Sequence, residues 1–133
     1  MALARLYVDG ASRGNPGQAG IGVVLEYGGA VRKVGEYVGV RTNNEAEYIA
    51  LIRGLEMALE MGVSEVTVYS DSQLLVRQLA GEYRVRSPRL RRLYEKAAAL
   101  IPKFSTFKIV HVGREENSEA DRLANTALAK NGR

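Results

Sequence analysis

Hydrophobic and polar positions alternate along the chain in blocks that predict strands first and helices later. The first blocks follow the period of two that is typical of strands, and Gly28-Gly29 between the second and third is a hairpin signal. The loop between the first two strands is expected over 10–19. Strands are expected over 3–9, 20–27, 30–40, 65–70 and 105–112.

Helical spacing of apolar residues marks the rest of the chain. Thr42 followed by Glu45 has the spacing of a capping box, and Ser70 with Gln73 suggests a second one. Helices are expected over 43–61, from Ser72 to Gly81, over 88–101 and over 118–130, with 131–133 as a tail. This order of elements predicts an α/β fold, a mixed sheet with helices packed on it.

Composition narrows the class of protein. The 133 residues are 46% hydrophobic, which predicts a single folded domain over 1–133. Cysteine is absent, which excludes disulfides and thiolate sites and suits the cytoplasm. No apolar run approaches ~18–20 residues and no signal-like leader opens the chain, so no membrane partner is expected. The net charge of +4 favours a polyanionic partner. The small size of the chain leads us to expect a monomer.

Two of the predicted strands end alike, in Tyr-x-Asp. Tyr7 and Asp9 share one face of the first strand, and Tyr69 and Asp71 share one face of the fourth, because side chains alternate along a strand. If the two strands are parallel neighbours, both aspartates emerge at their carboxyl ends. Open α/β sheets place ligands at that edge.

Two further acids stand near the starts of predicted helices. Glu47 borders the apolar stripe of its helix, and Asp121 aligns with Ala124 and Leu128 on a packed face. A carboxylate at the rim of a core is costly unless it is paired, and each acid alone could be a cap, a salt bridge or a solvated residue. Four gathered acids would repel one another strongly unless a cation neutralised them, which predicts a divalent-metal site.

The surroundings of the four acids resemble ribonuclease H of type 1. The matching stretches appear in that family's order and span nearly the whole chain; they are Tyr7–Ser12 with Gly14–Gly17, Thr42–Glu47, Tyr69–Gln73 and Ala120–Asn125. The resemblance implies a ribonuclease H-like fold, a five-stranded mixed sheet with the second strand antiparallel and helices on both faces. The segment over 81–92 is short, which is similar to members without a basic protrusion.

The same resemblance implies an activity. The family hydrolyses the RNA strand of RNA–DNA hybrids with carboxylates that hold two Mg²⁺ ions, for which Mn²⁺ would substitute. Its catalytic and metal-binding acids map onto Asp9, Glu47, Asp71 and Asp121, with Asp9 as the bridging ligand. Products would carry 5′-phosphate and 3′-hydroxyl ends, and cleavage would be largely independent of sequence. Oxygen-only ligands suit Mg²⁺ or Mn²⁺ and disfavour zinc.

Amide and hydroxyl side chains near the acids are the expected substrate contacts. The resemblance places them in the minor groove of the hybrid or, for Thr42, on a phosphate of the DNA strand; the set is Asn15, Thr42, Asn43, Asn44 and Gln73. Minor-groove 2′-hydroxyls distinguish a hybrid from DNA. A competing interpretation remains, because Thr42 also caps a helix and Asn15-Pro16-Gly17 is also an ordinary turn.

Four residues are secondary candidates. Many members carry a loop histidine before the last helix, and either His111 or Arg114 could take its place, although His111 falls on a predicted strand, where a structural role is common. Arg84 and Arg86 could bind DNA phosphates or form part of a solvated helix start.

Other functions remain open for the whole chain. The alternatives are an exonuclease, resolvase or integrase core, a non-catalytic binding module, and an enzyme that also cuts double-stranded RNA.

Overall fold

Five strands form one sheet in the order β3-β2-β1-β4-β5 in the computed structural model, which describes residues 2–131. β2 runs antiparallel to β1 and β3, whereas β4 runs parallel to β1 and β5. The expected five-stranded mixed sheet is therefore confirmed. The strands are β1 (Leu3–Ser12), β2 (Gly17–Tyr27), β3 (Ala30–Arg41), β4 (Glu65–Ser70) and β5 (Thr106–His111).

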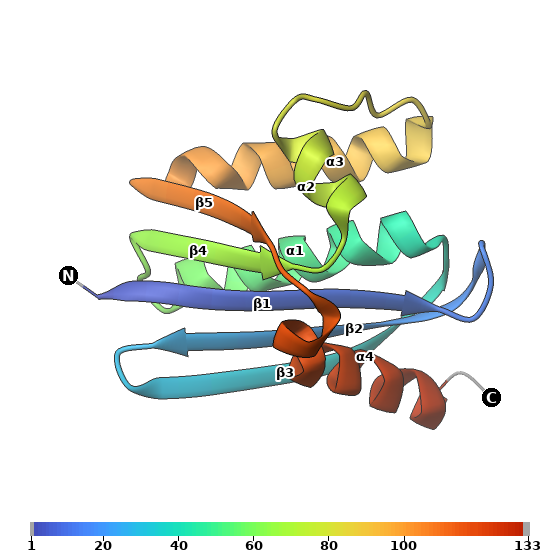
Figure 1. The fold of residues 1–133 in the computed structure, drawn as a ribbon, viewed down its shortest axis with the longest axis horizontal. Coiled ribbons are helices and arrows are strands. Elements are labelled where there is room, and N and C mark those ends of the chain that lie inside the picture. Colours follow the sequence, from blue (N-terminus) through green and yellow to red (C-terminus); the bar gives the residue numbers. More distant parts are fainter. Residues whose placement is uncertain (1, 132–133) are drawn as a thin grey trace.

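Helices cover both faces of this sheet. α1 and α4 lie on opposite faces, and α3 packs beside α1 (Figure 1). The helices are α1 (Asn43–Glu60), α2 (Gln73–Leu79), α3 (Pro88–Leu100) and α4 (Ser118–Asn131), with short 3₁₀ turns η1 (Ile101–Lys103) and η2 (Arg114–Asn117). Among the described residues, no helix has the length and apolar character needed to cross a lipid bilayer.

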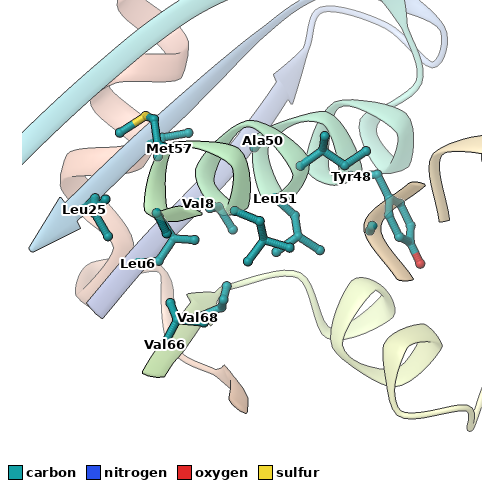
Figure 2. Close-up of a cluster of buried hydrophobic side chains, with 14 of the residues drawn as sticks. Leu6, Val8, Leu25, Tyr48, Ala50, Leu51, Met57, Val66 and Val68 are labelled. Carbon is teal, nitrogen blue, oxygen red and sulfur yellow. The ribbon is translucent and has the colours of Figure 1, made fainter. Parts of the chain in front are cut away.

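The main core lies between the sheet and α1. Leu6 and Val8 of β1 and Val68 of β4 are fully buried and pack toward Leu51 and its neighbours on α1 (Figure 2). A fully buried aliphatic side chain contributes roughly 1.5–3 kcal/mol, so this layer fixes the position of α1 on the sheet. These residues alternate along β1 with Tyr7 and Asp9, which therefore face the side covered by α4.

The opposite face is built on glycine, which lets α4 lie directly against the backbone of the sheet. A Cβ atom added at Gly35 would lie 2.8 Å from the carbonyl oxygen of Leu123, and one at Gly22 would overlap the carbonyl oxygen of Ala120. In the sheet, Gly22 is the neighbour of Gly35 on one side and of Asp9 on the other. The glycines thus bring the start of α4 down beside Asp9.

Several predicted boundaries were wrong by a few residues. The expected loop over 10–19 is only a turn, because β1 and β2 stay paired as far as Ser12 and Ala19. The second capping box does not form: Ser72 is the N-cap of α2, and its Oγ accepts from Leu75 N–H at 3.2 Å. The segment after β5 is the 3₁₀ turn η2 rather than a loop. In the predicted tail, Asn131 is still helical and 132–133 lie outside the described residues.

We predict that Gly22→Ala destabilises the fold, because the added methyl must displace the backbone of α4 at Ala120. Overpacking of this kind costs about 1–3 kcal/mol in the free energy of unfolding, measured by urea denaturation. Gly113→Ala is the matched control, since its Cβ would meet only the movable carboxylate of Glu116, at 3.3 Å. Equal stability of Gly22→Ala and wild type would contradict the close approach of α4.

Candidate active site

The register of two parallel strands places Asp9 beside Asp71. β1 and β4 pair in register as far as Tyr7 opposite Tyr69, and the two tyrosine rings stack with centroids 4.8 Å apart and an interplanar angle of 17°. Each aspartate follows its tyrosine by two residues and emerges on the same face. The predicted meeting of the two Tyr-x-Asp strands is confirmed.

Glu47 reaches the same point because α1 touches β1 at a glycine. A Cβ atom at Gly10 would lie 2.5 Å from the carbonyl carbon of Ala46 and 2.6 Å from the nitrogen of Glu47, so only glycine permits this approach. The Gly10 N–H donates to the Glu47 carboxylate. The other oxygen, Glu47 Oε2, is buried without a hydrogen-bond partner in the described part of the chain.

Three of the four acids form a tight cluster. One carboxylate oxygen from each of Asp9, Glu47 and Asp71 lies within 4.8 Å of the others. Asp121 lies outside this group of three but lines the same cleft and is close enough to Asp9 to raise its pKa. Asn125, one turn further along α4, donates to Asp121 Oδ1 at 3.2 Å and to the Asp121 carbonyl oxygen at 2.9 Å. The carboxylates thus converge from β1, from the bend after β4, and from α1 and α4.

Burial makes ionisation of the carboxylates in this cluster unfavourable. The pKa of Asp9 is raised well above its usual range by desolvation first, and then by the charges of Glu47 and Asp71. Desolvation, followed by the charge of Asp71, likewise raises the pKa of Glu47. A divalent cation at the cluster would offset both effects. The all-oxygen donor set and the unpartnered Glu47 Oε2 fit Mg²⁺ or Mn²⁺.

The cluster opens into a cleft of about 910 Å³. Four of the five expected substrate contacts line it: Asn15, Thr42, Asn43 and Asn44. Gln73 is exposed at the first turn of α2 and does not line the cleft itself, although its neighbours Ser72 and Leu74 do. His111 and Arg114 are exposed and line the cleft, whereas Arg84 and Arg86 are exposed and lie outside its lining.

Hydrogen bonds hold the polar rim of this cleft in place. The Asn43 backbone N–H donates to Asn15 Oδ1 at 3.0 Å, and the Ser12 N–H donates to Asn43 Oδ1 at 3.1 Å. Thr42 forms the predicted capping box: its Oγ1 accepts from Glu45 N–H at 3.0 Å, and the Glu45 carboxylate accepts from Thr42 N–H at 2.8 Å. These hydrogen bonds fix the positions of the rim residues relative to one another.

The Asn44 side chain is held in place by hydrogen bonds among buried polar side chains. Its Nδ2 donates to Gln78 Oε1 at 3.4 Å, and the same oxygen accepts from the Tyr48 hydroxyl at 2.9 Å. Tyr48 and Gln78 are buried, so they link α2 to α1 beneath the cleft. These bonds set the direction of the Asn44 amide.

The arginine-rich segment divides into paired and exposed members. Arg89 makes an ion pair with the buried Glu45 at 3.2 Å, which ties α3 to the start of α1. Arg91 donates to the Val85 carbonyl oxygen at 3.3 Å and lies 3.7 Å from Glu95. Arg84 and Arg86 remain the exposed cations of the segment between α2 and α3.

Other residues of the site were not singled out from the sequence. Gly10, Ser12, Leu74 and Asn125 all line the cleft. Asn125 carried a usable signal, because its spacing of four residues from Asp121 on a helix puts both side chains on one face. The others depend on contacts between distant segments, which spacing along the chain does not reveal.

This combination of a mixed sheet with carboxylates at the end of its first strand is that of the ribonuclease H-like proteins. The family model described as reverse transcriptase-like matches residues 7–127. A ribonuclease HI from Halobacterium salinarum is 47% identical over 92% of the chain. The crystal structure of RNase H1 from that archaeon superposes with a TM-score of 0.92 at 44% identity. The superposition covers 96% of this chain and 98% of that one. The chain belongs to the reverse transcriptase-like family, as a type 1 ribonuclease H member.

Two further similarities extend this result. The structure of LC11-RNase H1 in complex with RNA/DNA hybrid has a TM-score of 0.87 and 42% identity, covering 96% of this chain and 97% of that one. A bifunctional protein of Mycobacterium tuberculosis is 42% identical over 90% of the chain. The chain spans 62% of the length of the halobacterial relative and 34% of the mycobacterial one.

We predict that Asp9→Asn raises the free energy of unfolding of the metal-free protein at pH 8. In the unfolded chain this carboxyl loses its proton near pH 4, whereas in the fold its pKa is raised, so stability falls as pH rises above about 4. Removing the charge should recover roughly 1–3 kcal/mol, measured by denaturation at pH 5 and pH 8 in a chelator. Added Mg²⁺ should stabilise wild type more than the variant. A variant no more stable than wild type at pH 8 would contradict the unfavourable burial of the Asp9 carboxylate among like charges.

Proposed function

We propose that this protein is an endoribonuclease that hydrolyses the RNA strand of RNA–DNA hybrids. The observation that carries the proposal is the convergence of Asp9, Glu47 and Asp71 within 4.8 Å, with Asp121 beside them, in a cleft rimmed by amides. The similarity to a ribonuclease H solved with an RNA/DNA hybrid supports the choice of substrate. Mg²⁺ is the proposed cofactor and Mn²⁺ its substitute.

The four acids would hold the cations. Asp9 would be the ligand shared between the cations, because its carboxylate interacts with Glu47, Asp71 and Asp121. When bound, two divalent ions activate the attacking water and stabilise the leaving 3′ oxygen. The products would therefore carry 5′-phosphate and 3′-hydroxyl ends. Asn125 would orient the Asp121 carboxylate through its hydrogen bond.

The amide rim would recognise the duplex. Asn15 and Asn43 use their carbonyl oxygens within the rim, so their Nδ2 groups are the donors left for acceptors in a minor groove. Asn44 and Gln73 would add contacts from the starts of α1 and α2, and 2′-hydroxyls would mark the RNA strand. Thr42 would hold a phosphate of the DNA strand at the start of α1, where the helix dipole favours an anion.

His111 and Arg114 are proposed to assist proton transfer or product release, since both line the cleft. An exonuclease, resolvase or integrase core would share the acids, but the Asn43-Asn44 and Ser72-Gln73 pairs favour the hybrid nuclease. Cleavage of double-stranded RNA is the second candidate activity, because a wide minor groove with 2′-hydroxyls is common to both duplexes. A monomer in the cytoplasm is the proposed working form.

We predict that the wild type cuts a labelled RNA–DNA hybrid in Mg²⁺ and that Asp9→Asn lowers the rate by at least about 10³-fold, because loss of the bridging ligand removes several kcal/mol of transition-state stabilisation. The same assay should compare hybrid, double-stranded RNA, double-stranded DNA and single-stranded RNA in Mg²⁺ and in Mn²⁺. Equal rates for wild type and variant, or preference for DNA duplex, would overturn the proposal.

We predict that Arg84 and Arg86 contact phosphates outside the cleft. Replacing each with alanine should reduce the slope of log affinity against log salt by about 1, because each contact releases a counterion. Binding of hybrid is measured by fluorescence anisotropy in Ca²⁺. Arg32→Ala, on the exposed start of β3 near the hairpin, is the control and should leave the slope unchanged. Arg89 is unsuitable because it pairs with Glu45. Slopes identical to wild type would assign Arg84 and Arg86 to the solvated surface.

A further inference from the structure

A buried amide ties the start of α4 to the first strand. Asn117 is the last residue of η2 and is only 1% exposed. Its Nδ2 donates to the backbone carbonyl oxygen of Val8 at 2.8 Å, across 109 positions of sequence. A buried carbonyl requires a donor, and a neutral amide of this length supplies one without adding charge.

Both ends of this hydrogen bond adjoin candidate metal ligands. Val8 immediately precedes Asp9 on β1. Asn117 precedes Asp121 by four residues, about one helical turn. The bond therefore joins the backbone segments that carry two of the four acids, on the side of the cluster where Gly22 admits Ala120.

The hydrogen bond from Asn117 to Val8 opposes the repulsion between the carboxylates of Asp9 and Asp121. Asp9 and Asp121 line the same cleft, and like charges repel, so the two ionised carboxylates resist being held together without a cation. Packing of Ala120, Ala124 and Leu128 keeps α4 on the sheet, but apolar contacts tolerate small shifts along the helix axis. A directional hydrogen bond from Asn117 resists the shift that would separate Asp121 from Asp9.

We infer that Asn117 is a positioning residue, which holds Asp121 beside Asp9 so that both can bind the same divalent ions. The role in cation binding rests on the proposed function. The positioning itself rests on the hydrogen bond between Asn117 and Val8. Residues behind metal ligands commonly change metal affinity by 10–100-fold when they are replaced. Asn117 would act through the backbone of β1 and through α4, and would not contact the substrate.

The test is the affinity of the whole chain for Mn²⁺ and Mg²⁺, measured by isothermal titration calorimetry at a temperature where every variant is folded. Asn117→Ala should bind each ion about 10-fold or more weakly than wild type. Asn117→Ser is the second variant, because it keeps a polar group and leaves a smaller cavity while its shorter side chain loses direct reach to Val8. Asn117→Ser should also bind Mn²⁺ and Mg²⁺ more weakly than wild type.

Val66→Ala is the matched control. Val66 is fully buried near the opposite end of β4 from Asp71, so its truncation lowers the melting temperature without touching the cluster. Wild-type cation affinity in both Asn117 variants, or an equal loss in Val66→Ala, would overturn the inference. A wild type that binds neither ion would overturn it together with the proposed function. A wild type that binds ions yet leaves hybrid uncut would overturn the proposed function alone.

Discussion

Mutual repulsion among buried carboxylates is the constraint around which this molecule is organised. Asp9 and Glu47 are nearly inaccessible to solvent, and Asp71 lies within 4.8 Å of both. Such a group is unfavourable when charged and uncompensated, because burial and like charge both penalise ionisation. The fold must therefore hold the acids together by means unrelated to their own chemistry.

Those means are features of the backbone and the core. Parallel pairing of β1 with β4 aligns Asp9 with Asp71, and the stacked rings of Tyr7 and Tyr69 lie just before them. Gly10 allows α1 to touch β1, and Gly22 allows α4 to touch the neighbouring strand β2 from the other face. The aliphatic layer between the sheet and α1 supplies the favourable free energy that offsets the electrostatic cost (Figure 2).

Much of this arrangement was predictable, because it depends on local patterns. Alternation in the strands, the capping box at Thr42 and the repeated Tyr-x-Asp ending indicated the sheet, the start of α1 and the pairing of two acids. Glu47 and Asp121 were placed on packed helix faces, and resemblance to a family supplied the strand directions. The strand order itself was not predicted. The four acids and most of the amide rim do line one cleft.

The remaining features depend on contacts between distant segments. Nothing local to Asn117 indicates that its amide reaches Val8, and nothing local to Gly22 indicates that a helix will lie on it. The same limit applies to Arg89, because no local pattern indicates its ion pair with the buried Glu45. Ser70 was expected to cap α2, but its Oγ accepts from the Ser72 N–H, and Ser72 becomes the cap.

The central claim is that the acids at the end of β1 form a centre for divalent cations. It is tested most directly by anomalous diffraction from crystals of the whole chain soaked in Mn²⁺. The account predicts anomalous peaks within ligating distance of Asp9 and of at least one of Glu47, Asp71 and Asp121, in the cleft rimmed by Asn15 and Asn44. A cluster without Mn²⁺ at saturating concentration, or Mn²⁺ bound only elsewhere on the chain, would contradict it.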